Sequence, residues 1–485
     1  MLKKNTKKQK RAIKPLVVHI AAECTPFIKV GGLADVVGSL PQALNQKLQV
    51  AVIIPLPKSV RQKYNWKLLT SVTVPLDISH HERVAVYLFR HKSGVMYYGL
   101  QHSLFDDVIY SVPPGITVAE KFAFFSLAAV TFIADELPQT QLVHCHDWHT
   151  ALVPTFLDAA RQTHHLDHNI PSVFTIHNIA YQGLAPKSLT KTFKLKVDQE
   201  LAVMEDYHDN NQLNLMKIGI LSADKITTVS PRYARELLTI EQPSGLSPFI
   251  KRRKKDLVGI INGIDTASFN PATDSSIAQH YTKKTWRAGK EKNKTALRRK
   301  LNLAPSTVPI IGLIGRLVEQ KGLDILLPAL KQLLPSQTFQ CVIIGTGDKQ
   351  YEQALQQLAQ KFPQSLAVHI GFDDTLARQL YAGADGFLMP SRFEPCGLGQ
   401  LIAMCYGTVP IVRATGGLAD TVKDKVTGIV FKDYSVEALI KAIKQALNLY
   451  QKPQSWYTMV SRGMSKDVSW QNSARDYYQL YQSLL

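Results

Sequence analysis

Short runs of apolar, largely β-branched residues alternate with longer stretches of helical pattern along most of the chain. Such runs are typical of the buried strands of a parallel sheet, because helices cover both faces of that sheet. One set of runs lies at 16–22, 50–55, 141–145, 172–177 and 224–230. A second set lies at 308–315, 340–345, 366–371, 385–390 and 408–413. The sequence therefore predicts an α/β protein with two doubly wound parallel sheets.

The spacing of the two sets also predicts two domains. A chain of 485 residues is too long for one ordinary hydrophobic core. A polar, basic stretch follows position 265 and separates the two sets of strands. We therefore expect a basic tail over 1–14, a first domain over 15–265 and a second domain over 266–460.

The chain is strongly basic, with a formal net charge of +19. Much of this charge lies in the N-terminal tail, at 251–255 and at 283–300, and we interpret these segments as solvated, mobile parts of the surface. Aromatic residues are not interleaved with the basic ones, as a surface that stacks on bases would require. The composition therefore disfavours nucleic acid as a partner.

The sequence shows no signal for a membrane or for export. No apolar run approaches the roughly 18 residues that span a bilayer, and the N-terminus has no apolar core of a signal peptide. The five cysteines are scattered and lack CxxC spacing, which argues against a disulfide framework and a zinc ribbon. We expect a cytoplasmic protein with free thiols and no membrane partner.

Unusual polar residues follow several of the predicted strands, at the ends where open parallel sheets bind ligands. In "KVGGLADV", Lys29 with Gly31 and Gly32 could hold an anion, although a plain strand-to-helix turn would also need glycine. In "GRLVEQKG", Arg316 and Lys321 could hold a diphosphate, or they could be a pair of surface cations. These loops predict a ligand site in a cleft between the two sheets.

The segment "HCHDWHT" raises the possibility of a metal site. His144 and His146 share one face of a predicted strand, and Asp147 and His149 follow it. No second His/Asp cluster in the sequence completes a set of ligands, so we expect no metal. We favour histidines satisfied within the fold, with Asp147 near a ligand.

The segment "TIHNIAYQG" ends another predicted strand with His177. Asn178, Tyr181 and Gln182 follow it and form a set suited to the recognition of hydroxyl groups. A purely structural histidine is the alternative, and the residues alone leave both open.

The segment "SRFEPCGLGQL" places an acid before a tight turn and the start of a helix. The amides of the turn can face a phosphate. A phosphate would repel Glu394 at short range, so this carboxylate should point at the neutral hydroxyls of a sugar. The alternative is that Glu394 only caps the turn.

With these residues in order, the chain closely resembles the bacterial glycogen synthases and plant starch synthases of glycosyltransferase family 5. The motifs that carry the resemblance run through the whole chain: "KVGGLADVVGSLPQAL", "HCHDWHTALVP", "TIHNIAYQG", "TVSPRYARE", "INGID", "GRLVEQKGLDIL", "PSRFEPCGLGQL" and "ATGGLADTV". The resemblance implies the GT-B arrangement, in which two Rossmann-like domains face a cleft and a C-terminal helix, here 461–485, crosses back to the first domain. It implies retaining transfer of glucose from ADP-glucose to the non-reducing end of an α-1,4-glucan such as glycogen, with release of ADP and without metal or cofactor.

The resemblance also assigns roles to individual residues. Those expected at the donor are Lys29, Gly31, Gly32, Arg316, Lys321, Phe372, Cys396, Gly397, Leu398 and Gly399. Those expected in the sugar and acceptor region are Asp147, Asn178, Tyr181, Gln182 and Asn262. The catalytic set would be Glu394, His177, Arg316 and Lys321, with the two cations stabilising the departing diphosphate. The sequence leaves open whether the reaction forms a covalent intermediate or proceeds on one face of the sugar.

Two positions depart from the pattern of the family. Gly399 stands where threonine is common, so a hydroxyl contact to phosphate is lost. Phe372 stands where tyrosine is frequent at the position that stacks on the nucleobase, so stacking should survive. The segment 241–255 also lacks the usual form of a loop that lines the cleft.

Rival classes make different demands on the sequence. A Rossmann-type dehydrogenase needs GxGxxG directly after the first strand, and "CTPFIKVGGL" does not provide it. A nucleic-acid-binding protein would show salt-sensitive binding of oligonucleotides that does not depend on Glu394. A GT-B nucleotide-sugar epimerase would release nucleotide without any glucan.

Overall fold

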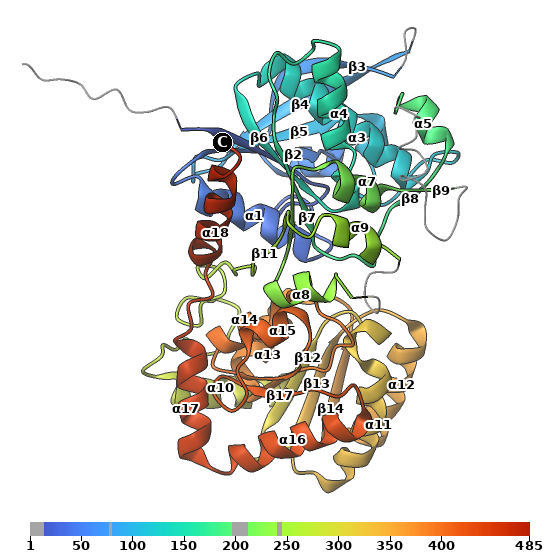
Figure 1. Cartoon of the computed structure of the whole chain (residues 1–485). Coiled ribbons are helices and arrows are strands. Elements are labelled where there is room, and N and C mark those ends of the chain that lie inside the picture. The colour runs from blue at the N-terminus through green and yellow to red at the C-terminus, as the bar shows by residue number, and fades with distance from the viewer. Residues whose placement is uncertain (1–13, 77–79, 196–211, 240–244) are drawn as a thin grey trace, which may run out of the picture. The chain divides into compact units, whose positions relative to one another are not determined.

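The computed structural model describes residues 14–76, 80–195, 212–239 and 245–485. Contacts divide the chain into two compact units, which Figure 1 shows in cartoon form. The first unit runs to Ile226 and includes Ala474–Leu485, and the second unit is Thr227–Ser473. Most of the basic tail 1–14 lies outside the described residues. Each unit is a doubly wound α/β structure, so the predicted fold class is confirmed.

The first unit is built on a largely parallel sheet. The strands that belong to this unit lie in the order β10-β7-β6-β1-β2-β5-β4-β3. Their bounds are β1 (Leu16–Ile20), β2 (Gln49–Pro55), β3 (Lys67–Pro75), β4 (His81–Arg90), β5 (Met96–Gln101), β6 (Thr140–His146), β7 (Ser172–Ile176) and β10 (Lys225–Thr228). Each of the five runs predicted in this half overlaps one of these strands. The sequence pattern missed β3, β4 and β5, because β3 and β4 form an antiparallel pair that is exposed on one side and lacks a long apolar run.

Helices flank this sheet: α1 (Gly32–Leu44), α2 (Lys58–Lys63), α3 (Val118–Glu136), α4 (Val153–Gln162), α5 (Ser188–Thr192) and α7 (Leu215–Ser222). The start of α3 shows how local sequence fixes such an element. The hydroxyl of Thr117 accepts the amide of Glu120, and the Glu120 carboxylate accepts the amide of Thr117. This capping box satisfies two amides that would otherwise lack partners at the helix start. A short pair, β8 (Leu184–Pro186) and β9 (Gln212–Asn214), lies apart from the main sheet.

The second unit contains a six-stranded sheet in the order β14-β13-β12-β15-β16-β17, with helices on both sides of its strands (Figure 1). The strands are β12 (Ile310–Ile314), β13 (Gln340–Gly345), β14 (Leu366–Ile370), β15 (Gly386–Met389), β16 (Val409–Arg413) and β17 (Ile429–Phe431), all in parallel pairs. Each of the five runs predicted here contains one strand, and only the short β17 was missed. The three-residue strand β11 (Leu257–Gly259) also lies in this part of the chain, but it pairs with β10 at the end of the nine-stranded sheet.

The helices of the second unit pack a core of its own. They are α8 (Pro231–Glu236), α9 (Ser247–Arg252), α10 (Trp286–Lys300), α11 (Leu323–Leu333), α12 (Lys349–Lys361), α13 (Asp374–Gly383), α14 (Gly399–Cys405), α15 (Gly416–Thr421), α16 (Val436–Tyr450) and α17 (Pro453–Met464). The last helix, α18 (Trp470–Gln482), runs into the first unit from Ala474. The predicted domain limits stay a prediction. Contacts group 227–265 with the second unit, where the amide of Arg232 donates to Asp420.

The interpretation of 283–300 as a mobile surface segment is wrong. Most of it is the helix α10, which buries several of its basic residues. Lys290 donates to three backbone carbonyls and to the hydroxyl of Thr408, and burial lowers its pKa to about 7. Lys294 lies 2.9 Å from Asp385. Charge runs usually lie on solvated faces, and here the periodicity of the helix turns part of the run inward.

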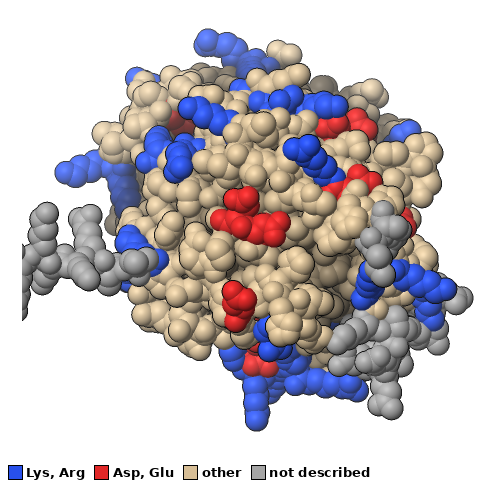
Figure 2. Space-filling view, turned by 90° about the horizontal axis from the view of Figure 1, so that it is seen from above, with Lys and Arg blue, Asp and Glu red and all other residues tan. Residues whose placement is uncertain are grey.

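Other surface features follow the composition. On the face shown in Figure 2, the Lys and Arg side chains of the described residues form several separate groups with Asp and Glu among them. Within the described ranges, no helix is both long and apolar enough to cross a membrane. All five cysteines are free thiols, as predicted.

The buried pair of Lys294 and Asp385 can be used to test whether α10 turns part of the basic segment 283–300 inward. In Lys294→Met, Asp385 keeps the amide of Ile310 as a donor but becomes a buried charge without its cation. We expect the free energy of unfolding to fall by about 3–5 kcal/mol, measured by urea denaturation followed by circular dichroism. The control is Lys292→Met on the exposed side of α10, which should change stability by less than about 0.5 kcal/mol. Equal effects of the two substitutions would contradict a buried ion pair.

Candidate active site

Both sheets reverse the order of their strands at one point. In the first unit the reversal lies between β1 and β6, and in the second unit it lies between β12 and β15. At such a point the loops after the two strands diverge to opposite faces and leave room for a ligand beyond the strand ends. The segments predicted to carry chemistry follow these strands. The fold therefore supplies one candidate half-site in each unit.

In the first unit, an acid organises the loop after β1. Glu23 is buried, and its Oε2 accepts the amides of Val30 and Gly31, each at 2.8 Å. Its Oε1 accepts the hydroxyl of Tyr110 at 2.5 Å. The amide of Gly31, predicted to face a phosphate, is thus engaged with a carboxylate of its own chain.

Lys29 lies on the same loop and remains partly exposed. Its Nζ is 2.8 Å from Oδ1 of Asp35, which is in the first turn of α1. A Cβ added to Gly31 would meet nothing within 4 Å, so internal packing does not require a glycine there. The open space beside Gly31 is suited to close approach by a ligand.

Asp147, at the end of β6, holds the next strand end in place. Its backbone has φ of 58°, a left-handed conformation that is uncommon for a residue with a side chain and is often found at functional sites. Its Oδ1 accepts the amides of His177 at 2.7 Å and of Asn178 at 3.4 Å. Burial raises the pKa of the Asp147 carboxyl to about 7, although these two hydrogen bonds oppose the shift. The loops after β6 and β7 are therefore joined through one buried carboxyl group whose pKa is raised.

His177 connects this half-site to the interior of the unit. Its Nε2 lies 3.0 Å from Nδ1 of His146, and burial lowers the pKa of His177 to about 3. His144 and His146 do share one face of β6, and together with His19 they offer nitrogen atoms within 4.8 Å of one another. His19 on β1 completes a cluster that the sequence pattern of "HCHDWH" did not reveal. This cluster has the residue types and the proximity that a metal site needs.

The remaining predicted residues of this half-site differ from one another. Tyr181 is 51% exposed, whereas the side-chain oxygen of Gln182 accepts a hydrogen bond from the side-chain Nδ2 of Asn214 at 2.5 Å. Asn178 accepts the amide of Ala180 through its own side chain. The structure thus brings Asp147, His177 and Asn178 together and gives Gln182 a structural bond within its unit.

In the second unit, Lys321 and Glu394 form a close ion pair across the point of strand reversal. Lys321 Nζ lies 2.6 Å from Glu394 Oε2, and the hydroxyl of Ser391 donates to the same oxygen at 3.0 Å. Lys321 follows β12 and Glu394 follows β15. Gly322 permits this approach, because φ is 79° and a Cβ there would lie 2.2 Å from the carbonyl oxygen of Pro390. A buried carboxylate and a partly exposed ammonium therefore share one site.

Arg316 lies at the exposed edge of the same half-site. Its Nη2 donates to the side-chain oxygen of Gln320 at 2.9 Å, while Gln320 Nε2 lies 3.4 Å from the carbonyl of Phe393. These two hydrogen bonds join the loop after β12 to the loop that carries Glu394. The structure thus pairs Lys321 with Glu394 and links Arg316, through Gln320, to the backbone of Phe393 next to Glu394.

The turn from Cys396 to Gly399 is held from inside by Gln400, which is fully buried. Gln400 Nε2 donates to the carbonyls of Cys396 at 3.0 Å and of Gly397 at 2.8 Å. Because each peptide unit is planar and trans, the amides of Gly397 and Leu398 point away from Gln400. Neither of these two amides has an acceptor among the described residues. The turn presents unused donors, as a phosphate site requires.

Packing explains the departure at Gly399. A Cβ at this position would lie 2.8 Å from Cε1 of Phe387 and 3.4 Å from the hydroxyl of Tyr381. A threonine would not fit without movement of the Phe387 ring. The ring of Phe387 on β15 therefore occupies the space that a threonine side chain at position 399 would need.

Two further predicted residues lie in this unit. Phe372 follows β14 and is 82% exposed, so its ring is available to a flat partner. Asn262 is buried, and its Oδ1 has no hydrogen-bond partner within the described part of the chain. Burial of such an atom is costly unless a ligand or water completes its bonding.

Sequence reasoning missed three residues that shape these half-sites: Glu23, Tyr110 and Gln400. The position of Glu23 directly after the first apolar run was the only available signal. Nothing in the sequence links Tyr110 to Glu23, which lies 87 residues earlier.

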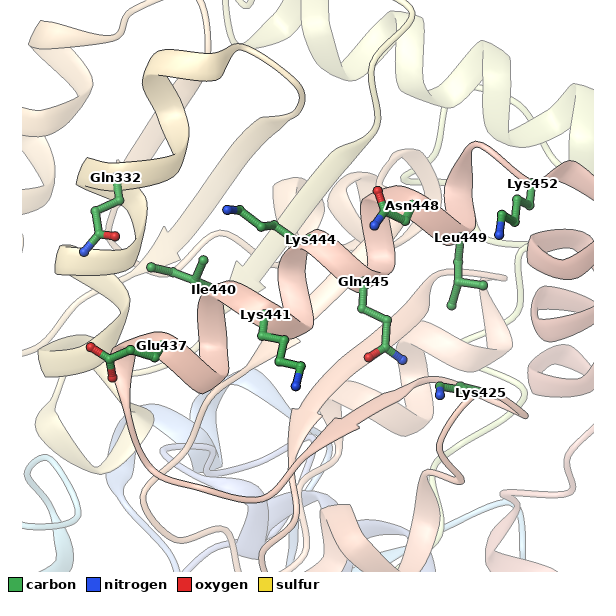
Figure 3. A pocket seen from close by; sticks show the side chains of 10 residues that line it. All are labelled: Gln332, Lys425, Glu437, Ile440, Lys441, Lys444, Gln445, Asn448, Leu449 and Lys452. Carbon is green, nitrogen blue, oxygen red and sulfur yellow. The ribbon is translucent and has the colours of Figure 1, made fainter.

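A hollow of about 690 Å³ along α16 lies elsewhere in the second unit (Figure 3). Its lining includes four lysines and none of the predicted site residues, so it is not part of the candidate site.

Comparisons with known proteins agree with this arrangement. Residues 16–252 match the family described as "Starch synthase catalytic domain", and residues 294–459 match "Glycosyl transferases group 1". The chain is 39% identical to the glycogen synthase of Alkaliphilus metalliredigens, over 96% of this chain and 99% of the relative. It is 41% identical to glycogen synthase 2 of Geobacter sulfurreducens, over 96% and 98% of the two chains.

Solved structures show the same relationship. The catalytic domain of starch synthase IV from Arabidopsis thaliana, bound to ADP and acarbose, matches with a TM-score of 0.89 and 33% identity over 97% of this chain and 99% of that one. Sucrose-phosphate synthase from Thermosynechococcus elongatus matches with a TM-score of 0.61 and 18% identity over 97% and 99% of the two chains. The second likeness concerns the fold alone.

The raised pKa of Asp147 predicts a dependence of stability on pH. Its carboxyl binds a proton more tightly in the folded state than in the unfolded state, so its contribution is complete below about pH 4 and is lost as pH rises through about 7. Asp147→Asn keeps an oxygen acceptor for both amides and cannot ionise. We expect the melting temperature of the wild type, relative to Asp147→Asn, to fall by roughly 5 °C between about pH 5 and pH 7. A constant difference across this range, measured by scanning fluorimetry, would show that Asp147 titrates as an ordinary carboxyl.

Proposed function

Because the chain belongs to the starch and glycogen synthase family of glycosyltransferases, we propose that it extends an α-1,4-glucan with glucose from ADP-glucose and releases ADP. The observation that carries this proposal is the match, over nearly the full length of both chains, to relatives named glycogen synthase. The choice of ADP is supported by the solved structure of starch synthase IV, which is bound to ADP and acarbose.

We assign the diphosphate of the donor to the second unit. Arg316, Lys321 and the unused amides of Gly397 and Leu398 are positive or hydrogen-donating groups at one strand reversal. In the reaction, the bond between the anomeric carbon and the phosphate oxygen breaks and negative charge grows on the diphosphate. Fixed donors placed in advance at that charge stabilise the transition state more than the ground state.

The pairing of Lys321 with Glu394 gives the carboxylate a defined place beside the diphosphate site. Two anions at short range would repel each other, and the ammonium group between them removes much of that cost. Glu394 would then use its remaining lone pairs for hydroxyls of glucose and would oppose the positive charge that develops at the anomeric carbon. This proposal develops the expectation that Glu394 points at the sugar.

The first unit would supply the contacts to the glucose and the acceptor. We assign His177 to the hydroxyls of the donor glucose, with Asp147, Asn178 and Tyr181 in the sugar and acceptor region. Asn262, which belongs to the second unit, would complete the residues of that region. The 4-hydroxyl at the glucan end attacks the anomeric carbon, and its proton leaves with the departing diphosphate. Gln182 would act through the loop after β7, because its side-chain oxygen is already bonded to Asn214.

The donor nucleotide can be tested directly. Purified protein is incubated with ADP-glucose or UDP-glucose, with and without glycogen, while release of the nucleotide is followed. We expect release that depends on glycogen and a higher kcat/KM with ADP-glucose. Equal or higher kcat/KM with UDP-glucose would overturn the choice of donor, and release without glycogen would favour the epimerase class.

The expected absence of a metal can be tested in the same assay. We expect activity to survive EDTA, because cationic side chains and backbone amides take the place of a metal at the diphosphate. Loss of activity that zinc alone restores would contradict this expectation and would direct attention to the histidine cluster.

Glu394→Gln separates a catalytic role from a structural one. The change preserves size and most hydrogen bonds but removes the charge, so kcat should fall by about 10²-fold or more if the charge serves the transition state. Binding of ADP should stay equal or become tighter, because Lys321 is no longer shared with a carboxylate. The measurements are kcat, the Kd of ADP and the melting temperature.

The matched control for this substitution is Ser391→Ala. It removes the hydroxyl that donates to the same oxygen of Glu394 but leaves the charge in place. We expect a loss of kcat of less than about tenfold. Retained kcat in Glu394→Gln, or a loss matched by weaker ADP binding, would mean that Glu394 only supports the turn.

A further inference from the structure

Three buried or half-buried histidines form a line that leads inward from the candidate site. Nε2 of His177 lies 3.0 Å from Nδ1 of His146. The other nitrogen of His146, Nε2, lies 3.0 Å from Nδ1 of His19. They stand on β1, at the end of β6 and directly after β7, strands that neighbour one another in the sheet. Both nitrogens of the middle ring are therefore used in contacts to other histidines.

The line continues to the last helix of the chain. The hydroxyl oxygen of Tyr481 on α18 lies 3.4 Å from Nε2 of His19 and 2.6 Å from Nδ1 of His144. Nε2 of His144 lies 2.5 Å from the hydroxyl of Thr175. We call this series the histidine chain: His177, His146, His19, Tyr481, His144 and Thr175. All of its members belong to the first unit.

The rings of the histidine chain are neutral near pH 7. Burial lowers the pKa of His19 and His177 to about 3 and holds the pKa of His144 and His146 well below its usual range. A neutral imidazole has one N–H and one lone pair. Each contact can hold only one proton, so along the rings of His177, His146 and His19 the direction of one hydrogen bond decides the direction of the next.

The distances around Tyr481 select one direction. A phenol donates more readily than it accepts, so its proton should lie in the shorter contact, at 2.6 Å to His144. His144 then carries its own proton on Nε2, toward Thr175. The lone pair of the Tyr481 oxygen is left to accept from Nε2–H of His19 across the longer contact. His19 must in turn accept from Nε2–H of His146.

We propose that the histidine chain holds His177 as the Nε2–H tautomer, and that Tyr481 of α18 sets this tautomer from the far end. His177 donates through Nε2 to His146 and keeps a lone pair on Nδ1, the nitrogen outside the chain. Resting on the proposed function, this makes His177 an acceptor for a hydroxyl of the donor glucose. His19, His146, His144 and Tyr481 are then positioning residues, since they act through His177.

A metal at His19, His144 and His146 is the competing interpretation of the same atoms. A bound metal would take lone pairs from nitrogens that the histidine chain uses for shared protons. The nitrogens within the chain lie 2.5–3.4 Å from a partner of the chain itself. The chain therefore accounts for these contacts without an added ligand, and zinc binding becomes one outcome of the test.

The test is ¹⁵N NMR of the full-length protein labelled at histidine, because nitrogens with and without a proton have well-separated chemical shifts. His177→Gln identifies the signals of His177 by difference. In the wild type we expect a proton on Nε2 and none on Nδ1 of His177. A proton on Nδ1 of His177 in the wild type would overturn the proposal, whether or not the protein is a transferase.

Tyr481→Phe tests whether the hydroxyl of Tyr481 on α18 sets the tautomer of His177. Without the hydroxyl, we expect both tautomers of His19, His146 and His177 to appear. In the transferase assay, kcat/KM should fall by about twofold if the two directions become equal and by about tenfold if the reverse one prevails. The control is Tyr477→Phe, which removes another buried hydroxyl from α18 and leaves the contacts of the histidine chain intact.

Three further results would overturn the proposal. The first is a single, unchanged His177 tautomer in Tyr481→Phe, and the second is mixed tautomers in Tyr477→Phe. The third is stoichiometric binding of Zn²⁺, added alone, with loss of the His19, His144 and His146 proton signals. If the protein shows no transferase activity at all, the proposed function fails. The NMR result still tests whether the histidine chain sets the tautomer of His177.

Discussion

Parallel strands end with unsatisfied polar groups and diverging loops, and a sheet can open a space among them only where its strand order reverses. Both units of this protein have one such point. The chemically distinctive loops follow the strands at or next to it, after β1, β6 and the neighbouring β7 in one unit and after β12 and β15 in the other. The rest of each unit supports these loops: the helices bury the sheet faces, and the sheet fixes where the loops begin.

Carboxylates perform much of the local construction. Glu23 collects two amides and a phenol, Asp147 collects the amides after β7, and Glu394 binds Lys321 and Ser391. Each joins segments that are distant in sequence. A buried acid is costly by itself, and these hydrogen bonds offset that cost. The electrostatic character of each half-site thus depends on acids as much as on the cations that first attract notice.

The strands and the loops that follow them could be predicted because parallel sheets leave a local record of buried apolar runs. The pairing of Lys321 with Glu394 could not, since it depends on β12 and β15 being neighbours although 73 residues separate the two side chains. The histidine cluster was missed for the same reason, because His19 looks like an ordinary residue of an apolar strand. The inward lysines of α10 were missed because charge was weighed without its helical period.

The contact between His144 and Tyr481 joins residues 337 positions apart. A ribosome releases the first unit's sheet long before it releases the helix segment that completes the packing around it. Until then His144 lacks its contact with Tyr481 of α18. The second unit is synthesised in the interval. The first unit to emerge is therefore the last to be finished, and loss of only the final dozen residues from the chain would leave its histidines open to water.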